Sequence, residues 1–453
     1  MDTLSNQLSS WSLPKKLSFR FAFIYFLLFI TLLDWYGLRI TAIIFYEFYF
    51  DMLLDTVIPW VGVHVFHIDY PITSPTFGNH SDSTFIYIQY FVTIMVAFVG
   101  ALLWSLFDRK RLHYDKLYYG LTVLIRYYLA ANLFAFALEK FFKTQFGDLT
   151  FYQLTQPVGD MTPMSLAWAF FGHSYPYNIF MGVAESAALL LLFRRTTPFG
   201  ALLTTAAMAN VVAVNISYDV HAKVFASMML VMALFLLLPY LQRILKFFFT
   251  GKAVALPIQQ GLVFQKRWKS RALLILKILI IAFELVPHLF WYARASERRL
   301  AKESAPFRGV YEVTDFVMNQ DTLAIDDPIR WDEVVLEDWW TSIRYKGDSI
   351  AFADLSLDKK EMLLYGDITE LSKKEKLIKQ ELGDEVALDS VLIARKIKIP
   401  INFETQDSIH LTFKGQLGTD SIYVSTKRKP LEINNFRLNR SKINIITEVP
   451  YIY

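Results

Sequence analysis

Ionisable side chains lie inside several long apolar stretches of this 453-residue chain. A charged group in hydrocarbon costs roughly 2.5–3.5 kcal/mol on insertion scales, so each one needs a partner or a wet cavity. Arg126 and Glu185 lie at similar depths in two consecutive stretches that cross in opposite directions. We therefore predict an Arg126–Glu185 ion pair, with Asn210 of the next stretch completing its hydrogen bonds. Such a pair could join helices or organise a functional site, and the sequence favours neither.

A second polar group is predicted toward the other end of the same stretches. Lys277, Glu284 and His288 are seven and four residues apart, so one helix face carries all three. This group has more titratable side chains than helix packing requires, and histidine is suited to proton exchange near neutral pH. We predict that the group lines an outward-opening polar pocket. Its members are Glu139, Lys140, Asn215, Asp219, His221, Lys223, Glu284 and His288.

Several classes of chemistry are disfavoured. The chain has no cysteine, which excludes disulfides, Cys-ligated zinc, iron–sulfur clusters and dithiol redox motifs. His64 and His67 could share a helix face, but no carboxylate stands at a metal-site spacing around them, and we expect no metal. No phosphate loop, nucleotide fingerprint or convincing Ser-His-Asp order is present. The net charge of +4 gives no reason to expect nucleic acid as a partner.

The elements that would position these side chains are membrane-spanning helices. Apolar residues make up 54% of the chain and charged residues only 19%, and the deficit of charge lies before residue 295. A bilayer core needs about 20 apolar residues, and such runs must be helical because hydrocarbon offers no hydrogen bonds to the backbone. Seven segments qualify, give or take one: residues 19–36, 85–107, 117–141, 177–193, 199–216, 224–245 and 272–292.

The distribution of Lys and Arg predicts the orientation. Short loops rich in these residues stay in the cytoplasm. Such loops precede the first span and follow the second, fourth and sixth, whereas the alternate loops carry few. We therefore predict a cytoplasmic N-terminus, a retained first span and an external C-terminal part. Aromatic residues interleaved with acids in 39–84 favour a helix lying on the external membrane surface over a re-entrant one, and residues 163–171 allow the same two interpretations.

From residue 306 onward charges become frequent and the apolar period changes to two, which is typical of strands. Strands are predicted at 310–317 and 443–446, hairpins at 342–352 and 410–425, and one helix at 370–382. We predict a small antiparallel β-barrel or sandwich. Such a barrel could hold a lipophilic ligand, but a fully packed platform is the favoured interpretation.

Four consecutive predicted spans carry a distinctive set of small and charged residues. The first contains Arg126 and ends in Lys140, and the second carries Gly182-x-x-Glu185 before a leucine-rich run and a basic turn. The third contains the small-residue stretch 200–213, and the fourth is 224–239. This pattern resembles the four-helix module of the DoxX-like family of membrane proteins. Family members include a quinone-linked thiosulfate oxidoreductase subunit and components linked to thiol redox or membrane maturation. The vitamin K-dependent carboxylase group is distantly similar and also pairs a helical bundle with an outer β domain.

Together these observations predict a mainly α membrane protein of the bacterial inner membrane. Its expected parts are a cytoplasmic segment (1–18), a bundle of about seven spans (19–295) with a DoxX-like module near 117–245, a linker (296–305) and a periplasmic β-rich domain (306–453). The leading hypothesis, which the resemblance suggests, is a quinone-like or other lipophilic molecule in the intramembrane pocket, serving envelope redox or maturation chemistry. The rivals are a non-enzymatic scaffold whose β domain docks an envelope partner, and a transporter. Against the transporter, no inverted repeat is evident.

Overall fold

The computed structural model forms two compact units. One comprises Met1–Phe146 and Ser174–Arg294, and the other Gly147–His173 and Ala295–Tyr453. The predicted helix at 370–382 and the predicted strand at 443–446 lie outside the residues that the structure describes. Those are residues 10–33, 56–72, 82–258, 266–303, 307–337, 340–347, 350–356, 361–365, 397–400, 404–405, 409–417, 420–436 and 438.

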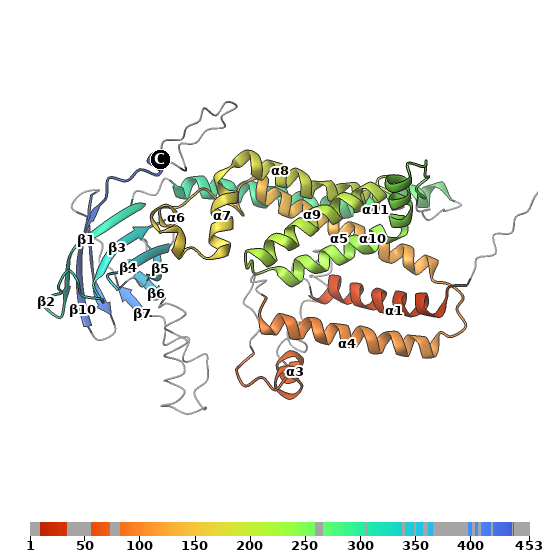
Figure 1. Cartoon of the computed structure of the whole chain (residues 1–453), viewed down its shortest axis with the longest axis horizontal. Helices are drawn as coiled ribbons and strands as arrows, with labels where there is room; N and C mark the ends of the chain where they lie inside the picture. The colour runs from red at the N-terminus through yellow and green to blue at the C-terminus, as the bar shows by residue number, and fades with distance from the viewer. Residues whose placement is uncertain are drawn as a thin grey trace, which may run out of the picture. The chain divides into compact units, whose positions relative to one another are not determined.

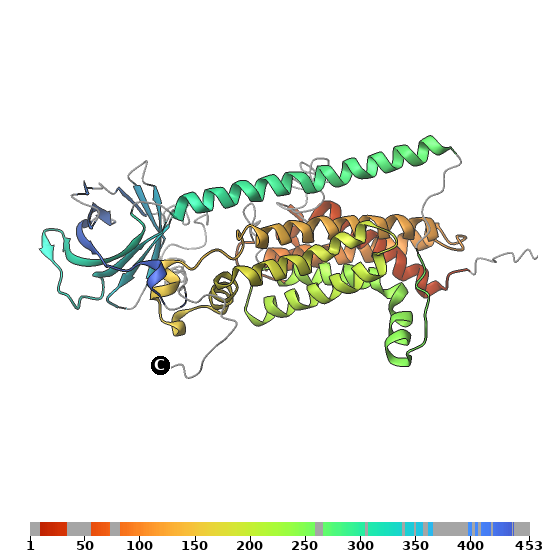
Figure 2. The same cartoon turned by 90° about the horizontal axis from the view of Figure 1, so that it is seen from above.

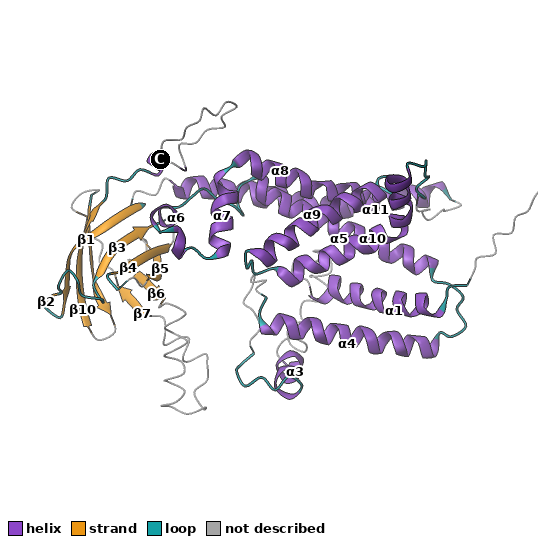
Figure 3. Cartoon of the chain, in the orientation of Figure 1, coloured by secondary structure: helices purple, strands orange, loops and turns teal. Residues whose placement is uncertain are grey.

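The first unit is a bundle of apolar helices (Figures 1 and 3). Among the described residues, six helices are long and apolar enough to cross a membrane. The predicted first span is helical as far as Leu33, but its α-helical part alone has only 16 residues. The helices are α1 (Leu13–Leu28) with the π-helix η1 (Phe29–Leu33), α3 (Ile58–His64), α4 (Thr84–Phe107), α5 (Asp115–Phe141), α8 (Tyr175–Ser186) with the 3-10 helix η4 (Ala187–Leu192), α9 (Thr197–Ser217), α10 (Lys223–Thr250) and α11 (Arg267–Glu303).

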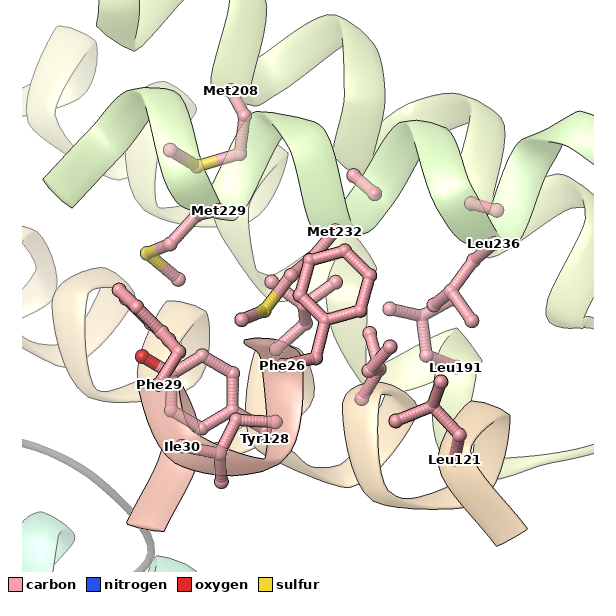
Figure 4. Packing of buried hydrophobic residues seen from close by; sticks show 14 of the residues in the cluster. Phe26, Phe29, Ile30, Leu121, Tyr128, Leu191, Met208, Met229, Met232 and Leu236 are labelled. Atoms are coloured by element: carbon pink, nitrogen blue, oxygen red, sulfur yellow. The ribbon is translucent and has the colours of Figure 1, made fainter. Parts of the chain in front are cut away.

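The centre of this bundle is α5. Of the 18 residues that form its most apolar stretch, 72% are buried, against 6% for the corresponding stretch of α11. Figure 2 shows α11 as one long helix. Tyr128 of α5 is fully buried among Phe29, Met229 and Met232, as Figure 4 shows. Small residues of α5, including Ala130 and Ala137, are also fully buried, which permits the close helix approach typical of membrane bundles. A helix surrounded by protein is the one on which buried polar groups can find partners.

The short helix α3 lies at the beginning of α4. Its Ile58 packs against Phe85 and Ile88, in the first two turns of α4. Trp60 on the opposite side is 56% exposed, and tryptophan is enriched at the membrane–water boundary. This arrangement supports the surface-lying interpretation for this part of 39–84; residues 34–55 and 73–81 lie outside the described ranges.

The second unit contains one curled antiparallel sheet of ten strands (Figure 1). Strand order is β7-β6-β5-β4-β3-β1-β10-β9-β8, with β2 paired to β1, and the sheet curls until β7 approaches β9. Its inner face is filled by Trp331, Phe316 and Phe413, all buried. The strands are β1 (Gly309–Met318), β2 (Asp321–Thr322), β3 (Trp331–Leu336), β4 (Trp340–Tyr345), β5 (Ile350–Ser356), β6 (Glu361–Tyr365), β7 (Ile397–Pro400), β8 (Glu404–Thr405), β9 (His410–Leu417) and β10 (Asp420–Arg428).

The sequence-based strands agree with this sheet. The stretch 310–317 lies within β1, and both predicted hairpins form, as β4–β5 and β9–β10. Because every described strand belongs to one sheet, the barrel-like alternative fits the domain better than a two-sheet sandwich. The prediction of a helical membrane bundle followed by an antiparallel β domain is confirmed.

A segment from between two spans belongs to the β unit. The sequence predicts residues 147–173 to be part of the bundle (19–295), but α6 (Phe151–Thr155), the 3-10 helix η3 (Val158–Asp160) and α7 (Pro163–His173) group with the strands. Phe151 is buried against Val310 and Val335, on the face of the sheet opposite the inner core. The backbone N–H of Tyr152 donates to Oε1 of Glu337 at 3.2 Å, at the positively polarised start of α6.

This docking constrains how the chain threads the membrane. The end of α5, the start of α8 and the end of α11 must lie on one side, because the parts they lead into form one compact unit. Four spans, namely α8–η4, α9, α10 and α11, separate the docked segment from the strands, and an even number returns the chain to the same side. The fold is therefore consistent with the predicted threading, and which side is periplasmic stays a prediction.

Cysteine labelling can test the threading without background, because the chain has no cysteine. We expect Asp160→Cys and Gly347→Cys, both exposed in the β unit, to react with an impermeant thiol reagent once the outer barrier is permeabilised. Lys110→Cys, exposed between α4 and α5, should react only after the inner membrane is opened. If one of Asp160→Cys and Gly347→Cys reacted from outside and the other only after the inner membrane was opened, the threading would be contradicted.

Candidate functional site

A buried ion pair joins α5 to α8. Nζ of Lys140 lies 2.9 Å from Oε2 of Glu185, and each side chain is only 7% exposed. The ammonium also faces the rings of Phe136 and Phe146, at 5.9 and 5.7 Å from their centroids. Glu185 was predicted to pair with Arg126, and that prediction is wrong: Lys140 lies four turns further along the same side of α5.

The close approach of α5 and α8 at this pair depends on Gly182. A Cβ atom at this position would meet the ring of Phe141 at 2.5 Å and the carbonyl oxygen of Ala137 at 3.1 Å. Tyr175, at the beginning of α8, donates its hydroxyl to the carbonyl oxygen of Phe141 at 3.0 Å. The Gly182-x-x-Glu185 pattern therefore acts as one unit, in which the glycine brings the backbones together and the glutamate, one turn later, meets Lys140.

Arg126 has a different partner, at the far end of the 3-10 helix η4, which continues α8. Its Nε donates to the carbonyl oxygen of Leu191 at 2.6 Å, and Arg126 is 1% exposed. Lys277 of α11 donates to the carbonyl of Leu192 at 2.8 Å, and Thr196 to that of Leu190 at 2.6 Å. Three consecutive carbonyls at the negatively polarised end of η4 thus each receive a side-chain donor, two of them cationic. Arg126 stabilises a helix end instead of neutralising a carboxylate.

On α5 and α11, Glu139 and Tyr292 are joined by a hydrogen bond. The Tyr292 hydroxyl donates to Oε1 of Glu139 at 2.7 Å, and the His288 ring stacks on the Tyr292 ring with a centroid separation of 6.4 Å. Glu284, one turn before His288, is only 4% exposed. The predicted inward face of the last span is therefore observed for Lys277 and Glu284. Because Glu139 directly precedes Lys140 in the chain, two carboxylates, an ammonium, a phenol and an imidazole gather where the end of α5 meets the second half of α11.

The remaining predicted residues lie at the turn between α9 and α10 or on the outside of the bundle. Asn215 donates to the carbonyl of Ala222 at 3.1 Å, and Asp219 accepts from Nζ of Lys223 at 2.6 Å. This hydrogen bond and the Lys223 charge hold the pKa of Asp219 below its ordinary value. The side chains of Asp219, His221 and Asn210 are exposed. Asn210 therefore does not complete a buried network, and the second predicted group is divided between two places with different partners.

Asp82 was not singled out from the sequence. Its carboxylate accepts the backbone N–H groups of Lys223 and Val224 at 2.9 and 3.1 Å, and so caps the start of α10. Its position in the chain, two residues before α4, carries no signal for a cap on a helix that begins 141 residues later. Among the described residues, no group of three or more His, Asp or Glu could hold a metal ion.

Comparison with known proteins adds one relative. No family model matches the chain, and no solved structure matches it. A stretch of 119 residues is 35% identical to the uncharacterized protein YwoB of Bacillus subtilis (strain 168), and it covers 26% of this chain and 75% of that protein. This chain belongs to the YwoB family. The name of the YwoB relative states no activity.

This YwoB-family chain also contains a polar network that sequence analysis missed, where α1 meets α4 and α5. Arg20 is 2% exposed and donates to the Tyr114 hydroxyl at 2.9 Å, the Ser105 hydroxyl at 2.6 Å and the Asp108 carbonyl at 2.8 Å. Tyr114 in turn donates to the Asp108 carboxylate at 2.9 Å. The network was not predicted from the sequence, although Arg20 lies inside the apolar run 19–36 and an arginine in such a run indicates a buried network.

We expect this network to make the bundle sensitive to acid. Burial disfavours ionisation of Asp108, but hydrogen bonds from Tyr114 and Trp104 and the charges of Arg111 and Arg20 outweigh it and lower its pKa. A lowered pKa in the folded state contributes stability above the ordinary pKa of about 3.9, and this stability is lost as the pH falls below it. The detergent concentration at the midpoint of unfolding should therefore decrease as the pH is lowered from about 5 to about 3. Asp108→Asn should reduce that dependence; an unchanged slope would contradict the assignment.

Proposed function

We propose that this chain is a platform of the bacterial inner membrane: a DoxX-like helical bundle that anchors a periplasmic β domain, which docks an envelope partner protein. The observation that carries this proposal is that three buried ionisable side chains each have a local partner. Lys140 has Glu185, Arg126 has a backbone carbonyl, and Glu139 has Tyr292. Polar groups matched in this way join helices, at roughly 0.6–2 kcal/mol per hydrogen bond, without a shared wet interior.

Two further observations support the anchor. The residues that carry the DoxX-like resemblance, Lys140, Gly182 and Glu185, act on one another at a single helix contact. The β unit is joined to the bundle by three chain connections, at residues 146–147, 173–174 and 294–295, where a simple C-terminal domain would have one. The Lys and Arg distribution supports a periplasmic position for that unit.

Photo-crosslinking in cells tests the platform. A photoreactive residue at Ile325 or Ile329, which are 74% and 52% exposed before β3, should give a discrete protein adduct. The same residue at Lys110, on the predicted cytoplasmic side, is the control and should not give that adduct. The adduct should persist when Lys140→Met and Glu185→Leu are combined, because the pair is assigned to anchoring. Absence of an adduct at every exposed β position would contradict the proposal.

A second candidate is the binding of a quinone-like lipophile beside Glu139, Tyr292 and His288. The observation in its favour is the hydrogen-bonded Glu139–Tyr292 pair with the stacked His288, where the end of α5 meets the second half of α11. Here Glu139 or His288 would exchange protons with a bound headgroup, and the quinone would supply the electron-carrying part. Extraction of lipids from the purified chain tests it. A stoichiometric quinone that is lost in Tyr292→Phe, with Tyr87→Phe as an exposed control, would favour this candidate over the platform.

A further inference from the structure

We propose that α7 is a membrane-surface helix: it lies in the lipid headgroup boundary and binds the β unit to the bilayer directly. This inference concerns the lipid contact of the second unit and does not depend on which function is correct. It rests on the exposed side chains of α7, on its place in the chain and on the charges around it.

The exposed face of α7 is apolar. Leu166 and Phe170, four residues apart, lie on one face and are 43% and 65% exposed. The adjacent face, about 100° round the helix, is buried, with Ala167 at 2% and Phe171 at 9% exposure. Val158, in η3 just before α7, is 69% exposed. An exposed stripe of this kind, backed by a buried face, is the pattern of a helix that meets an apolar environment on one side.

The chain itself indicates which apolar environment that is. Helix α7 ends at His173, and the membrane-spanning helix α8 begins at Tyr175. With one residue between them, the two helix ends can lie at most about 7 Å apart, so the end of α7 must lie at the membrane–water boundary. The helix groups with the β unit and not with the bundle, which disfavours a re-entrant position, because a re-entrant segment must be surrounded by protein or line a wet cavity.

The lipid contact is hydrophobic and not electrostatic. There is no Lys or Arg between residues 144 and 193, and 147–173 contains only the acids Asp148 and Asp160. Surface helices that select anionic lipids carry basic residues on their polar face. We therefore infer that α7 binds any fluid bilayer, whether its headgroups are zwitterionic or anionic.

Fluorescence quenching tests this placement in the full chain. A single fluorophore is attached at Phe170→Cys in phosphatidylcholine nanodiscs, with Asp321→Cys on exposed strand β2 as the aqueous control. A nitroxide on the lipid acyl chain should quench the probe at residue 170 several-fold more than the probe at residue 321. Aqueous iodide should quench the probe at residue 170 several-fold less than the probe at residue 321. The result should not change when phosphatidylglycerol is added.

Other outcomes overturn the inference. Iodide quenching at residue 170 equal to that at residue 321 would mean that α7 faces water. Protection from both quenchers would mean that protein covers it. A requirement for phosphatidylglycerol would replace hydrophobic insertion with headgroup recognition. Because one probe can distort a short helix, Leu166→Cys on the same face must give the same pattern as Phe170→Cys, and disagreement between them would also contradict a lipid-facing stripe.

Discussion

Replacing Glu185 with leucine is expected to lower the free energy of unfolding of the bundle by about 3 kcal/mol. The change leaves the Lys140 ammonium buried without its carboxylate, between the rings of Phe136 and Phe146. The loss should be much smaller when Lys140→Met is added, because an apolar pair of similar volume removes the stranded charge. The measurement is reversible unfolding in mixed detergent micelles, followed by tryptophan fluorescence.

A double-mutant cycle separates this pair from the Arg126–Glu185 alternative. Coupling between Lys140→Met and Glu185→Leu should reach about 1–3 kcal/mol, whereas Arg126→Leu and Glu185→Leu should add to within about 0.5 kcal/mol. Arg126→Leu alone should cost about 1–3 kcal/mol, since it leaves the Leu191 carbonyl without its donor. Asn210→Leu on the exposed side of α9 is the neutral control. Strong coupling of Glu185 to Arg126 would refute the observed pairing.

The spans and strands were predictable because each follows from a local pattern. A run of about 20 apolar residues requires a helix in hydrocarbon, and period-two alternation requires a half-buried strand. The sequence also indicates that Arg126 and Lys140 lie on the same side of α5, since 14 residues correspond to about four turns. Which of the two pairs with Glu185 could not be predicted from the sequence. Depth counted from the end of each apolar run does not include the axial offset between neighbouring helices.

That offset is set by features distant in sequence. Helix α8 tightens into η4 after Ser186, and the carbonyls of η4 take Arg126 and Lys277 as donors. The segment between α5 and α8 docks on strands that lie more than 150 residues later, through Tyr152 and Glu337. Neither feature leaves a mark in local hydropathy. The same reason explains why 147–173 was assigned to the bundle: its apolar residues are visible, but the surface that buries Phe151 is not.

A methyl group at Gly182 is expected to destabilise the bundle by about 1–3 kcal/mol, because it must displace the Phe141 ring or separate α5 from α8. Separation would also lengthen the Lys140–Glu185 contact one turn away, so Gly182→Ala should weaken the coupling measured between those two residues. The effect should be larger with Gly182→Leu, which cannot be accommodated by a small ring shift. Unfolding in mixed micelles and the double-mutant cycle repeated in the Gly182→Ala background provide the two readouts.

Gly120 of α5 supplies the matched control, because a Cβ there meets nothing within 4 Å. Alanine gains about 0.5–1 kcal/mol over glycine inside a helix, and both substitutions receive that gain. Gly120→Ala should therefore be neutral or stabilising, and the difference between the two variants isolates the contact with Phe141 from helix propensity. Equal stability changes at the two glycines would show that α5 and α8 do not depend on close approach at Gly182. The ion pair would then have to be held by the helices' other contacts alone.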